Sequence, residues 1–229
     1  ANDRRFYHAP DVVQTYLENN VTPVDKVVIT SGDRPHPRED DVDNTLFALN
    51  DLITDTGSDA LIDSGSGLPL DSVIVKADLA DTEFCLSDET SAACVASASD
   101  TEGWFLDYEQ LGEKGLSKPL VVDGTVFATS YLPNGEPGAG GGADICSPPE
   151  GSSRLYALSL NNGAPTVHLS DNLDTKFVPI GDGLLGDVKP LGSDFILVPG
   201  TGVDGKQILK AAGRSQLKIY WYEKGLDIP

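Results

Sequence analysis

The chain has 229 residues, 39% of them hydrophobic, which is enough to form a sizeable globular core. Sixteen basic residues against 36 acidic ones give a formal net charge of −20. Such a charge repels phosphate backbones and anionic lipid surfaces, which argues against nucleic acid and membrane surfaces as partners. We interpret the acidity as a solvated surface; attraction of divalent cations or of a basic protein partner is the alternative.

The sequence shows neither a membrane span nor a signal peptide. No run of about 18 apolar residues is present, so no membrane span is expected. The chain begins ANDRRFYHAP, without an apolar signal core, and contains no methionine. We therefore expect a processed chain or a fragment of a longer protein.

Short apolar segments between turns are expected to be strands, because glycine and proline are abundant and no long helical periodicity occurs. In chain order these segments are DKVVITSGD from Asp25, TLFALND from Thr45, DSVIVKADL from Asp71, GWFLDYE from Gly103, SDFILVPG from Ser193 and QLKIYWYE from Gln216. PLVVDGTVFATSYL, from Pro119 to Leu132, is expected to be a hairpin whose Asp123-Gly124 pair forms a tight primed turn. The sequence thus predicts an all-β fold.

One phrase of the sequence occurs twice. In the first copy, VVITSG from Val27 is followed by a polar loop, here called an excursion, and then by LFAL (Leu46–Leu49). In the second copy, VFATSY from Val126 is followed by another such excursion and then by LYAL (Leu155–Leu158). A small alanine between large neighbours suits tightly packed sheet faces, as in a propeller blade. Blades of roughly 40 to 50 residues predict about four or five in this chain. A partial propeller leaves an open edge, which again indicates missing chain.

The second excursion is rich in glycine and proline and is expected to be a surface loop that contacts partners. The residues assigned to this contact loop are Pro133, Asn134, Glu136, Pro137, Asp144 and Cys146.

The three cysteines do not have zinc-site spacing. Cys85 and Cys94 are the candidate disulfide pair, since a bridge closing that short loop contributes roughly 2.5 to 3 kcal/mol by the chain-entropy estimate. Cys146 is then unpaired or bonded to a part of the protein outside this chain.

No motif for catalysis or for a resident metal is recognised. GDGLLG, from Gly181, matches a dinucleotide-binding pattern literally, but Pro190 interrupts the helix that such a site needs, so we interpret it as a turn. Asp40, Asp41 and Asp43 lie close together without the glycine and closing glutamate of a calcium loop, which favours a solvated acidic loop. Histidines are scattered and no nucleophile elbow occurs. We expect no enzyme activity and no catalytic or metal-binding residue.

Several separated segments, in order, resemble the C-terminal domain of the PilY family, tip-associated biogenesis proteins and adhesins of type IV pili. The segments are RRFYHAPDV (4–12), VVITSGDRPHP (27–37), GWFLDYEQLGEKGLSKPLVVDGTVFATSYLP (103–133) and CSPPEGSSRLYALSLNNG (146–163). The likeness thins beyond Gly163, although LKIYWYEK resembles the end of such proteins.

The resemblance implies that residues 1–229 are the C-terminal portion of a modified β-propeller, with further blades and upstream domains outside this chain. It implies a place at the cell surface or pilus tip of a Gram-negative bacterium, reached through the periplasm and outer membrane. The implied roles are pilus assembly, twitching motility and attachment to host or abiotic surfaces. The implied partners are minor pilins and the rest of the propeller. Some members bind calcium through an Asp/Asn-rich loop, which would lie before Ala1. The resemblance therefore implies calcium for the parent protein only, and no cofactor is expected in this chain.

Two other classes remain open. Quinoprotein dehydrogenases are propellers with a similar LYAL phrase, yet their tryptophan and glycine docking pattern occurs here at most once, in GWFLDYEQLGEKG (103–115). A pure scaffold propeller that holds other envelope proteins is the second alternative.

Overall fold

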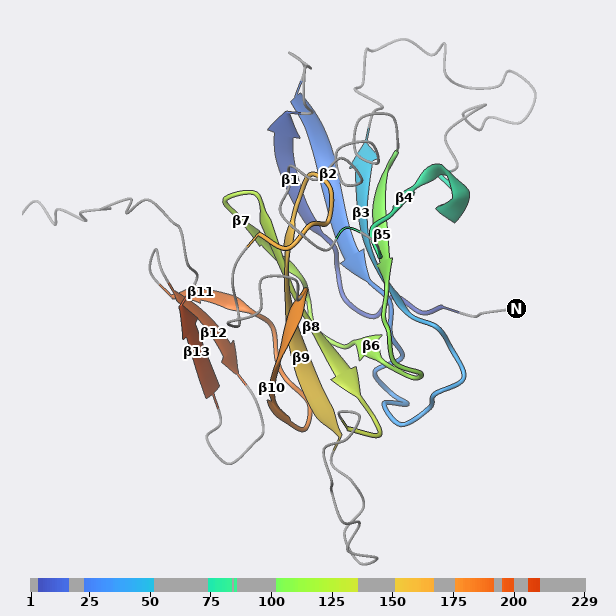
Figure 1. The fold of residues 1–229 in the computed structure, drawn as a ribbon, viewed down its shortest axis with the longest axis vertical. Helices are drawn as coiled ribbons and strands as arrows, with labels where there is room; N and C mark the ends of the chain where they lie inside the picture. Colours follow the sequence, from blue (N-terminus) through green and yellow to red (C-terminus); the bar gives the residue numbers. More distant parts are fainter. Residues whose placement is uncertain are drawn as a thin grey trace, which may run out of the picture.

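The structure is a computed structural model that describes residues 4–16, 23–51, 74–83, 85, 102–135, 151–166, 176–191, 195–199 and 206–210. These residues form three β-sheets and one short 3₁₀ turn, Lys76–Asp78 (Figure 1). The predicted all-β fold is therefore confirmed. Within the described part, no helix has the length and apolar character needed to cross a membrane.

Neighbouring strands within each sheet are mainly antiparallel. Sheet 1 has the order β1 (Asp11–Tyr16), β2 (Pro23–Thr30), β3 (Thr45–Asp51), β5 (Gly103–Asp107) and β4 (Ala80–Asp81), the last pair being parallel. Sheet 2 has the order β10 (Phe177–Asp182), β9 (Ser152–Ser159), β8 (Thr125–Leu132) and β6 (Lys114–Gly115), and β7 (Leu120–Val122) also pairs with β8. Sheet 3 has the order β11 (Lys189–Leu191), β12 (Phe195–Pro199) and β13 (Lys206–Lys210).

The predicted hairpin is present as β7 and β8. Asp123 and Gly124 form its turn with φ angles of 48° and 72°. Two successive positive φ angles are the signature of a type I′ turn, whose twist matches that of the flanking strands. The tight primed turn that the sequence predicted at this Asp-Gly pair is therefore confirmed.

The two copies of the repeated phrase form the same strand pair in the same register. Each copy lies in two neighbouring inner strands of its sheet, β2 with β3 in sheet 1 and β8 with β9 in sheet 2. The matched pairs are Val27–Leu49, Val28–Ala48, Ile29–Phe47 and Thr30–Leu46 in the first copy, and Val126–Leu158, Phe127–Ala157, Ala128–Tyr156 and Thr129–Leu155 in the second. The repeat is thus a structural unit.

Sheets 1 and 2 pack through opposite faces of this unit. In the core between them, sheet 1 contributes the leucine–alanine face of its copy, Leu46 and Ala48. Sheet 2 contributes the aromatic–leucine face of its copy, Tyr156 and Leu158. The other face of sheet 2, which includes Val178 and Ile180 of β10, packs in a second core with Leu185 and Val188. The sheets therefore stack head to tail, as blades do, and not face to face about a two-fold axis.

Buried polar contacts cross the same interface. The Lys26 ammonium on β2 is fully buried and donates to the carbonyl oxygens of Leu160 at 2.8 Å and Asn161 at 3.3 Å, just beyond β9. Trp104 Nε1 on β5 donates to the same Leu160 carbonyl at 2.9 Å. Because these donors are buried, their loss would leave carbonyls without partners inside the protein.

Three sequence expectations concern the segments that begin at Asp71, Gly181 and Gln216. The strand expected from Asp71 is wrong over its described part, because Lys76–Asp78 forms a 3₁₀ turn in which the Asp78 carboxylate accepts the Val75 N–H at 2.9 Å. GDGLLG is the end of β10 and a bend at Gly183, as predicted, with no helix in the described residues that follow. The strand expected from Gln216 lies outside the described residues.

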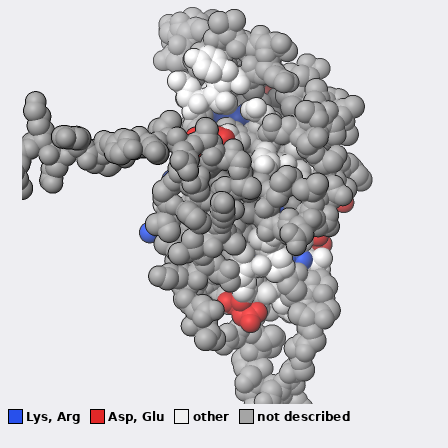
Figure 2. Space-filling view, turned by 60° about the vertical axis from the view of Figure 1, so that its left-hand side comes forward, with Lys and Arg blue, Asp and Glu red and all other residues white. Residues whose placement is uncertain are grey.

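Figure 2 shows where charged atoms of the described residues lie on one face. The red acidic and blue basic atoms there form small separate patches beside white, uncharged ones. The described residues of this view therefore point to no partner class.

The alanine of the repeat tests how tightly the sheets pack. Ala48 is fully buried, and Ala157 is 1% exposed. We expect Ala48→Leu and Ala157→Leu each to lower the free energy of unfolding by about 1–3 kcal/mol, because added methylenes overpack the core. Urea denaturation measures this. The control Leu111→Ala, at a site 65% exposed, should change it by less than about 0.5 kcal/mol. Unchanged stability in both leucine variants would contradict this packing.

The buried Lys26 makes stability depend on alkaline pH. Burial lowers its pKa from 10.5 to about 8. Between these values the unfolded chain binds more protons than the folded one, so this lysine makes unfolding free energy rise from pH 8 to 10. Above pH 10 the buried Tyr108 and Tyr156, whose pKa values burial raises, act in the opposite direction.

Denaturation curves at several pH values in this window should show a smaller rise for Lys26→Met than for the parent chain. Lys118→Met, at a side chain 43% exposed, is the control and should keep the parental slope. A parental slope in Lys26→Met would show that Lys26 does not release its proton in the folded state.

Candidate functional site

The candidate site lies in the loop of residues 31–44, which joins β2 to β3. This loop is the excursion of the first repeat copy and corresponds to the contact loop between β8 and β9 in the second. Both excursions therefore leave the repeated strand pair at the same end.

The two ends of the loop are fastened to each other. Ser31 N–H donates to the Thr45 carbonyl at 2.9 Å, and Thr45 N–H donates to Ser31 Oγ at 2.8 Å. The loop also runs close to β6, where a Cβ on Gly32 would lie 2.4 Å from the Gly115 carbonyl oxygen. Glycine is therefore required at position 32, and the loop begins from a fixed base.

A buried lysine holds the middle of the loop. Lys114 on β6 is 2% exposed, and its ammonium donates to the carbonyl oxygens of His36, at 3.2 Å, and Glu39. Desolvation lowers the Lys114 pKa, although the charges of Asp33, Glu39 and other loop carboxylates oppose this shift. The cation therefore sits under an acidic loop and fixes its backbone at two points.

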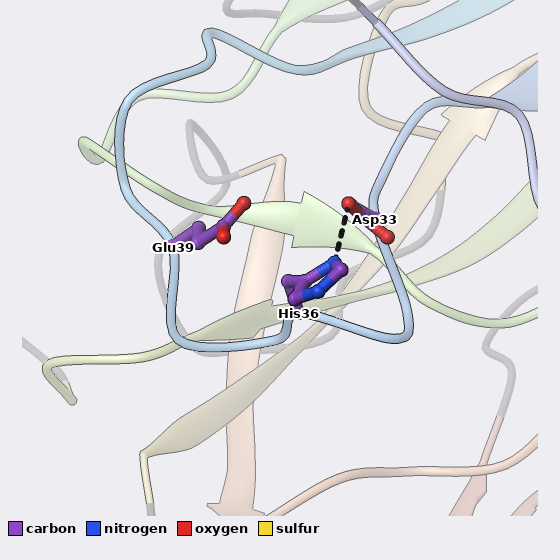
Figure 3. Close-up of side chains that lie close together, drawn as sticks. All are labelled: Asp33, His36 and Glu39. Atoms are coloured by element: carbon purple, nitrogen blue, oxygen red, sulfur yellow. Dashed lines mark hydrogen bonds and ion pairs between the residues drawn. The ribbon is translucent and has the colours of Figure 1, made fainter.

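Three potential ligand side chains converge above this lysine. Figure 3 shows that Asp33, His36 and Glu39 point into the space that the loop encloses. One ligand atom from each lies within 4.8 Å of the others. Asp33 Oδ2 is 3.0 Å from His36 Nδ1 and 2.6 Å from Arg5 Nη1. We call these three residues the Asp–His–Glu cluster.

Asp33 is the charged centre of the cluster. Desolvation is the largest single cause and raises its pKa, but the hydrogen bond from His36 and the positive charges of Arg5 and His36 together outweigh it, so the net pKa lies below its usual range. Asp33 is therefore a carboxylate at neutral pH and is able to balance a cation.

A small polar pocket adjoins the cluster. Its volume is about 190 Å³. Its lining residues are acids, cations and an asparagine, with Val42 the one apolar side chain: Arg5, Asp33, Glu39, Asp41, Val42, Asn44 and Lys114. This lining suits water, an ion or a small polar group better than an apolar ligand.

A buried carboxylate forms the floor beneath the loop. Glu113 is 1% exposed and accepts hydrogen bonds from Arg154 at 3.0 Å, Tyr156 at 2.7 Å and Ser130. Its backbone carbonyl accepts from Asn44 Nδ2 at 3.1 Å. Desolvation raises the Glu113 pKa, and the bonds from Ser130, Arg154 and Tyr156 counter that rise. The donors that bond to Glu113 come from sheet 2 and from the loops. Glu113 therefore joins the site to the core.

The sequence-predicted residues lie largely elsewhere. Asp40, Asp41 and Asp43 are exposed, and Asp41 lines the pocket without belonging to the cluster. Of the contact loop, Pro133 is buried and Asn134 is exposed, whereas Glu136, Pro137, Asp144 and Cys146 lie outside the described residues. Cys85 forms a disulfide, but Cys94 also lies outside them, so this pairing stays a prediction.

Sequence reasoning did not single out the Asp–His–Glu cluster. Its residues have the spacing D-x-x-H-x-x-E, with prolines on both sides of His36. This spacing matches neither a zinc-binding histidine pair nor a calcium loop, because the cluster combines one imidazole with two carboxylates. Glu113 carried no signal, since nothing in GWFLDYEQLGEKG marks a buried acid.

Comparison with known proteins gives the fold. No protein-family model matches the sequence, and no curated protein matches it. Among solved structures, the Pseudomonas aeruginosa PilY1 C-terminal domain is similar, with a TM-score of 0.54 and 13% sequence identity over 91% of this chain. The matched region covers 45% of that chain, so this chain spans less than half of its length. The chain is thus all-β, with its sheets arranged as in part of that modified β-propeller domain.

The anchoring role of Lys114 is testable. Lys114→Met keeps a similar volume but removes the donors to the His36 and Glu39 carbonyls. We expect faster amide hydrogen exchange across residues 33–44 and a loss of about 1–3 kcal/mol of unfolding free energy, because buried acceptors lose their partners. Exchange mass spectrometry measures the first, and urea denaturation the second.

Lys118→Met is the matched control. Lys118 is 43% exposed at the side chain and pairs with Asp11 on β1 at 3.2 Å. Its replacement should leave exchange in residues 33–44 unchanged. Equal protection of the loop in the Lys114 and Lys118 variants would refute the anchoring role.

Proposed function

We propose that this chain is part of a non-enzymatic type IV pilus module, working in pilus assembly, twitching motility and attachment. The observation that carries the proposal is the fold match to the PilY1 C-terminal domain over 91% of the chain. The ordered sequence segments that resemble the PilY family give independent support. With this role come a location at the cell surface or pilus tip and minor pilins as partners.

The remaining part of the same propeller is the first partner we propose. Phe47 and Leu49 of the first copy correspond to Tyr156 and Leu158 of the second, and sheet 1 covers the latter pair. Phe47 and Leu49 are only partly buried, and Phe6, which contacts Phe47 at a ring distance of 6.1 Å, is 51% exposed. The leucine–alanine face of another sheet would cover them in the same head-to-tail manner.

Attachment is assigned to the two excursions of the repeat. Both loops leave the sheets at the same end, and the first is held rigidly by Lys114 and by Ser31. Binding sites are commonly built from such loops on a rigid sheet scaffold. The contact loop of residues 133–151 is the proposed surface for host or abiotic material.

Deletion of the gene tests the proposal. We expect loss of surface pili or of attachment, measured by electron microscopy and by adhesion counts, with recovery on complementation. A complementing gene whose contact loop is shortened within residues 136–147 should restore pili but alter attachment. Normal pili together with normal attachment in the deletion strain would rule out the pilus role.

The outcomes also separate the alternative classes. Restored pili with unaltered attachment by the shortened-loop protein would assign this domain to a scaffold role. A quinone-type absorbance band in the purified protein would instead favour a dehydrogenase. Circular dichroism of the shortened-loop protein verifies that its sheets are intact.

A further inference from the structure

The Asp–His–Glu cluster has a mixed donor set that the pilus role does not use. It combines one imidazole and two carboxylates on a single loop, and their ligand atoms already lie within 4.8 Å of one another. Imidazole suits zinc, copper, iron and nickel, whereas calcium takes six to eight oxygen ligands. The donor set therefore differs from that of a calcium loop.

We propose that Asp33, His36 and Glu39 form a binding site for a first-row divalent transition metal, with zinc the best-matched ion. Zinc binds nitrogen and carboxylate oxygen at about 2.0–2.2 Å and accepts three protein ligands with a fourth position left open. Tetrahedral bonds of that length place ligand atoms roughly 3.4 Å apart. Asp33 Oδ2 and His36 Nδ1 are already within this separation, at 3.0 Å, so the contraction, of about an ångström, is needed at Glu39.

The side chains are free to make this contraction while the backbone stays fixed. His36 and Glu39 are exposed at the side chain, so their rotamers can close on an ion. Their carbonyl groups are both held by the buried Lys114 ammonium. Pro35 and Pro37 further restrict the backbone around His36. A site whose backbone is fixed beforehand loses less entropy on binding.

The charge balance also suits a dication. Residues 33–43 carry five carboxylates and two arginines. Arg5, whose side chain is 54% exposed, provides the present counter-charge to Asp33. A metal ion would take this place beside Asp33, and the guanidinium would move into solvent.

The open coordination position would face the adjoining pocket. Asp33 and Glu39 both line that pocket, together with Lys114 and Asn44. Water or an anionic group entering the pocket would complete the coordination, near the positive charges of Arg5 and Lys114. The site is therefore able to bind a metal alone or to hold a carboxylate of a partner through it.

The test is metal titration of the protein, purified without a polyhistidine tag and stripped of metal by a chelator. Isothermal titration calorimetry with zinc chloride should show one equivalent bound to the parent protein. His36→Gln, Asp33→Asn and Glu39→Gln should each weaken this binding by about tenfold or more, as a ligand matters at least as much as its outer-shell partners. Calcium chloride and magnesium chloride should give weaker binding than zinc.

Asp40→Asn is the matched control for Asp33→Asn. It removes the same charge from the same loop, but from a residue outside the cluster. It should retain zinc affinity within about twofold, the usual scale of a screened surface charge. Diffraction data collected at the zinc absorption edge should place the ion among the three side chains.

Several results would overturn the proposal. These are no zinc uptake by the parent protein, parental affinity in both His36→Gln and Glu39→Gln, or calcium binding as tight as zinc binding at the same residues. Circular dichroism of each variant separates lost binding from lost folding, and Glu39→Gln serves if Asp33→Asn unfolds. None of these readouts depends on pilus assembly.

Discussion

The buried Glu113 carboxylate is the interaction on which the joint between the sheets and the candidate site depends. Removing a carboxylate from water costs several kcal/mol, so the fold must supply donors in return. Arg154 and Tyr156 supply them from β9, and Ser130 supplies one from β8. Each donor has a fixed place only if the two central strands of sheet 2 are in register. The segment between β5 and β6 is thereby held against sheet 2, which puts Lys114, the next residue, beneath the loop of the site.

Head-to-tail stacking explains why the same repeated sequence occurs in two sheets that have different surroundings. If the sheets met face to face, both copies would present their leucine–alanine faces to the shared core. Instead, Ala48 of sheet 1 meets the face of sheet 2 that carries Tyr156. A small residue opposite a large one lets the layers approach closely, and every added sheet repeats the same contact. Such an interface turns the aromatic–leucine face of sheet 1 away from the shared core, whereas the two sheets of a sandwich bury equivalent faces.

The sequence predicted what local patterns specify and missed what only tertiary contacts decide. The turn at Asp123-Gly124 follows from its φ preferences, and the strand that contains Leu46–Leu49 follows from its apolar pattern. By contrast, the stretch around Val75 is apolar and β-branched, yet the Asp78 carboxylate caps it as a 3₁₀ turn. The partners of Glu113 come from strands that begin 12 and 39 residues later, so no local window contains them. The Asp–His–Glu cluster is local in sequence, but its backbone is fixed by Lys114 from another sheet.

Buried lysines show how a chain of net charge −20 uses its few cations. Lys26, Lys114 and Lys176 each donate to two backbone carbonyls of a neighbouring loop: those of Leu160 and Asn161, of His36 and Glu39, and of Thr82 and Glu83. None relies on a carboxylate partner for these bonds. A carbonyl pair accepts an ammonium without adding a second buried charge, which leaves the acids free to face solvent. The cations therefore stiffen the bases of the loops while the loop rims remain acidic, and a rim of that kind on a rigid base is what a cation-binding surface requires.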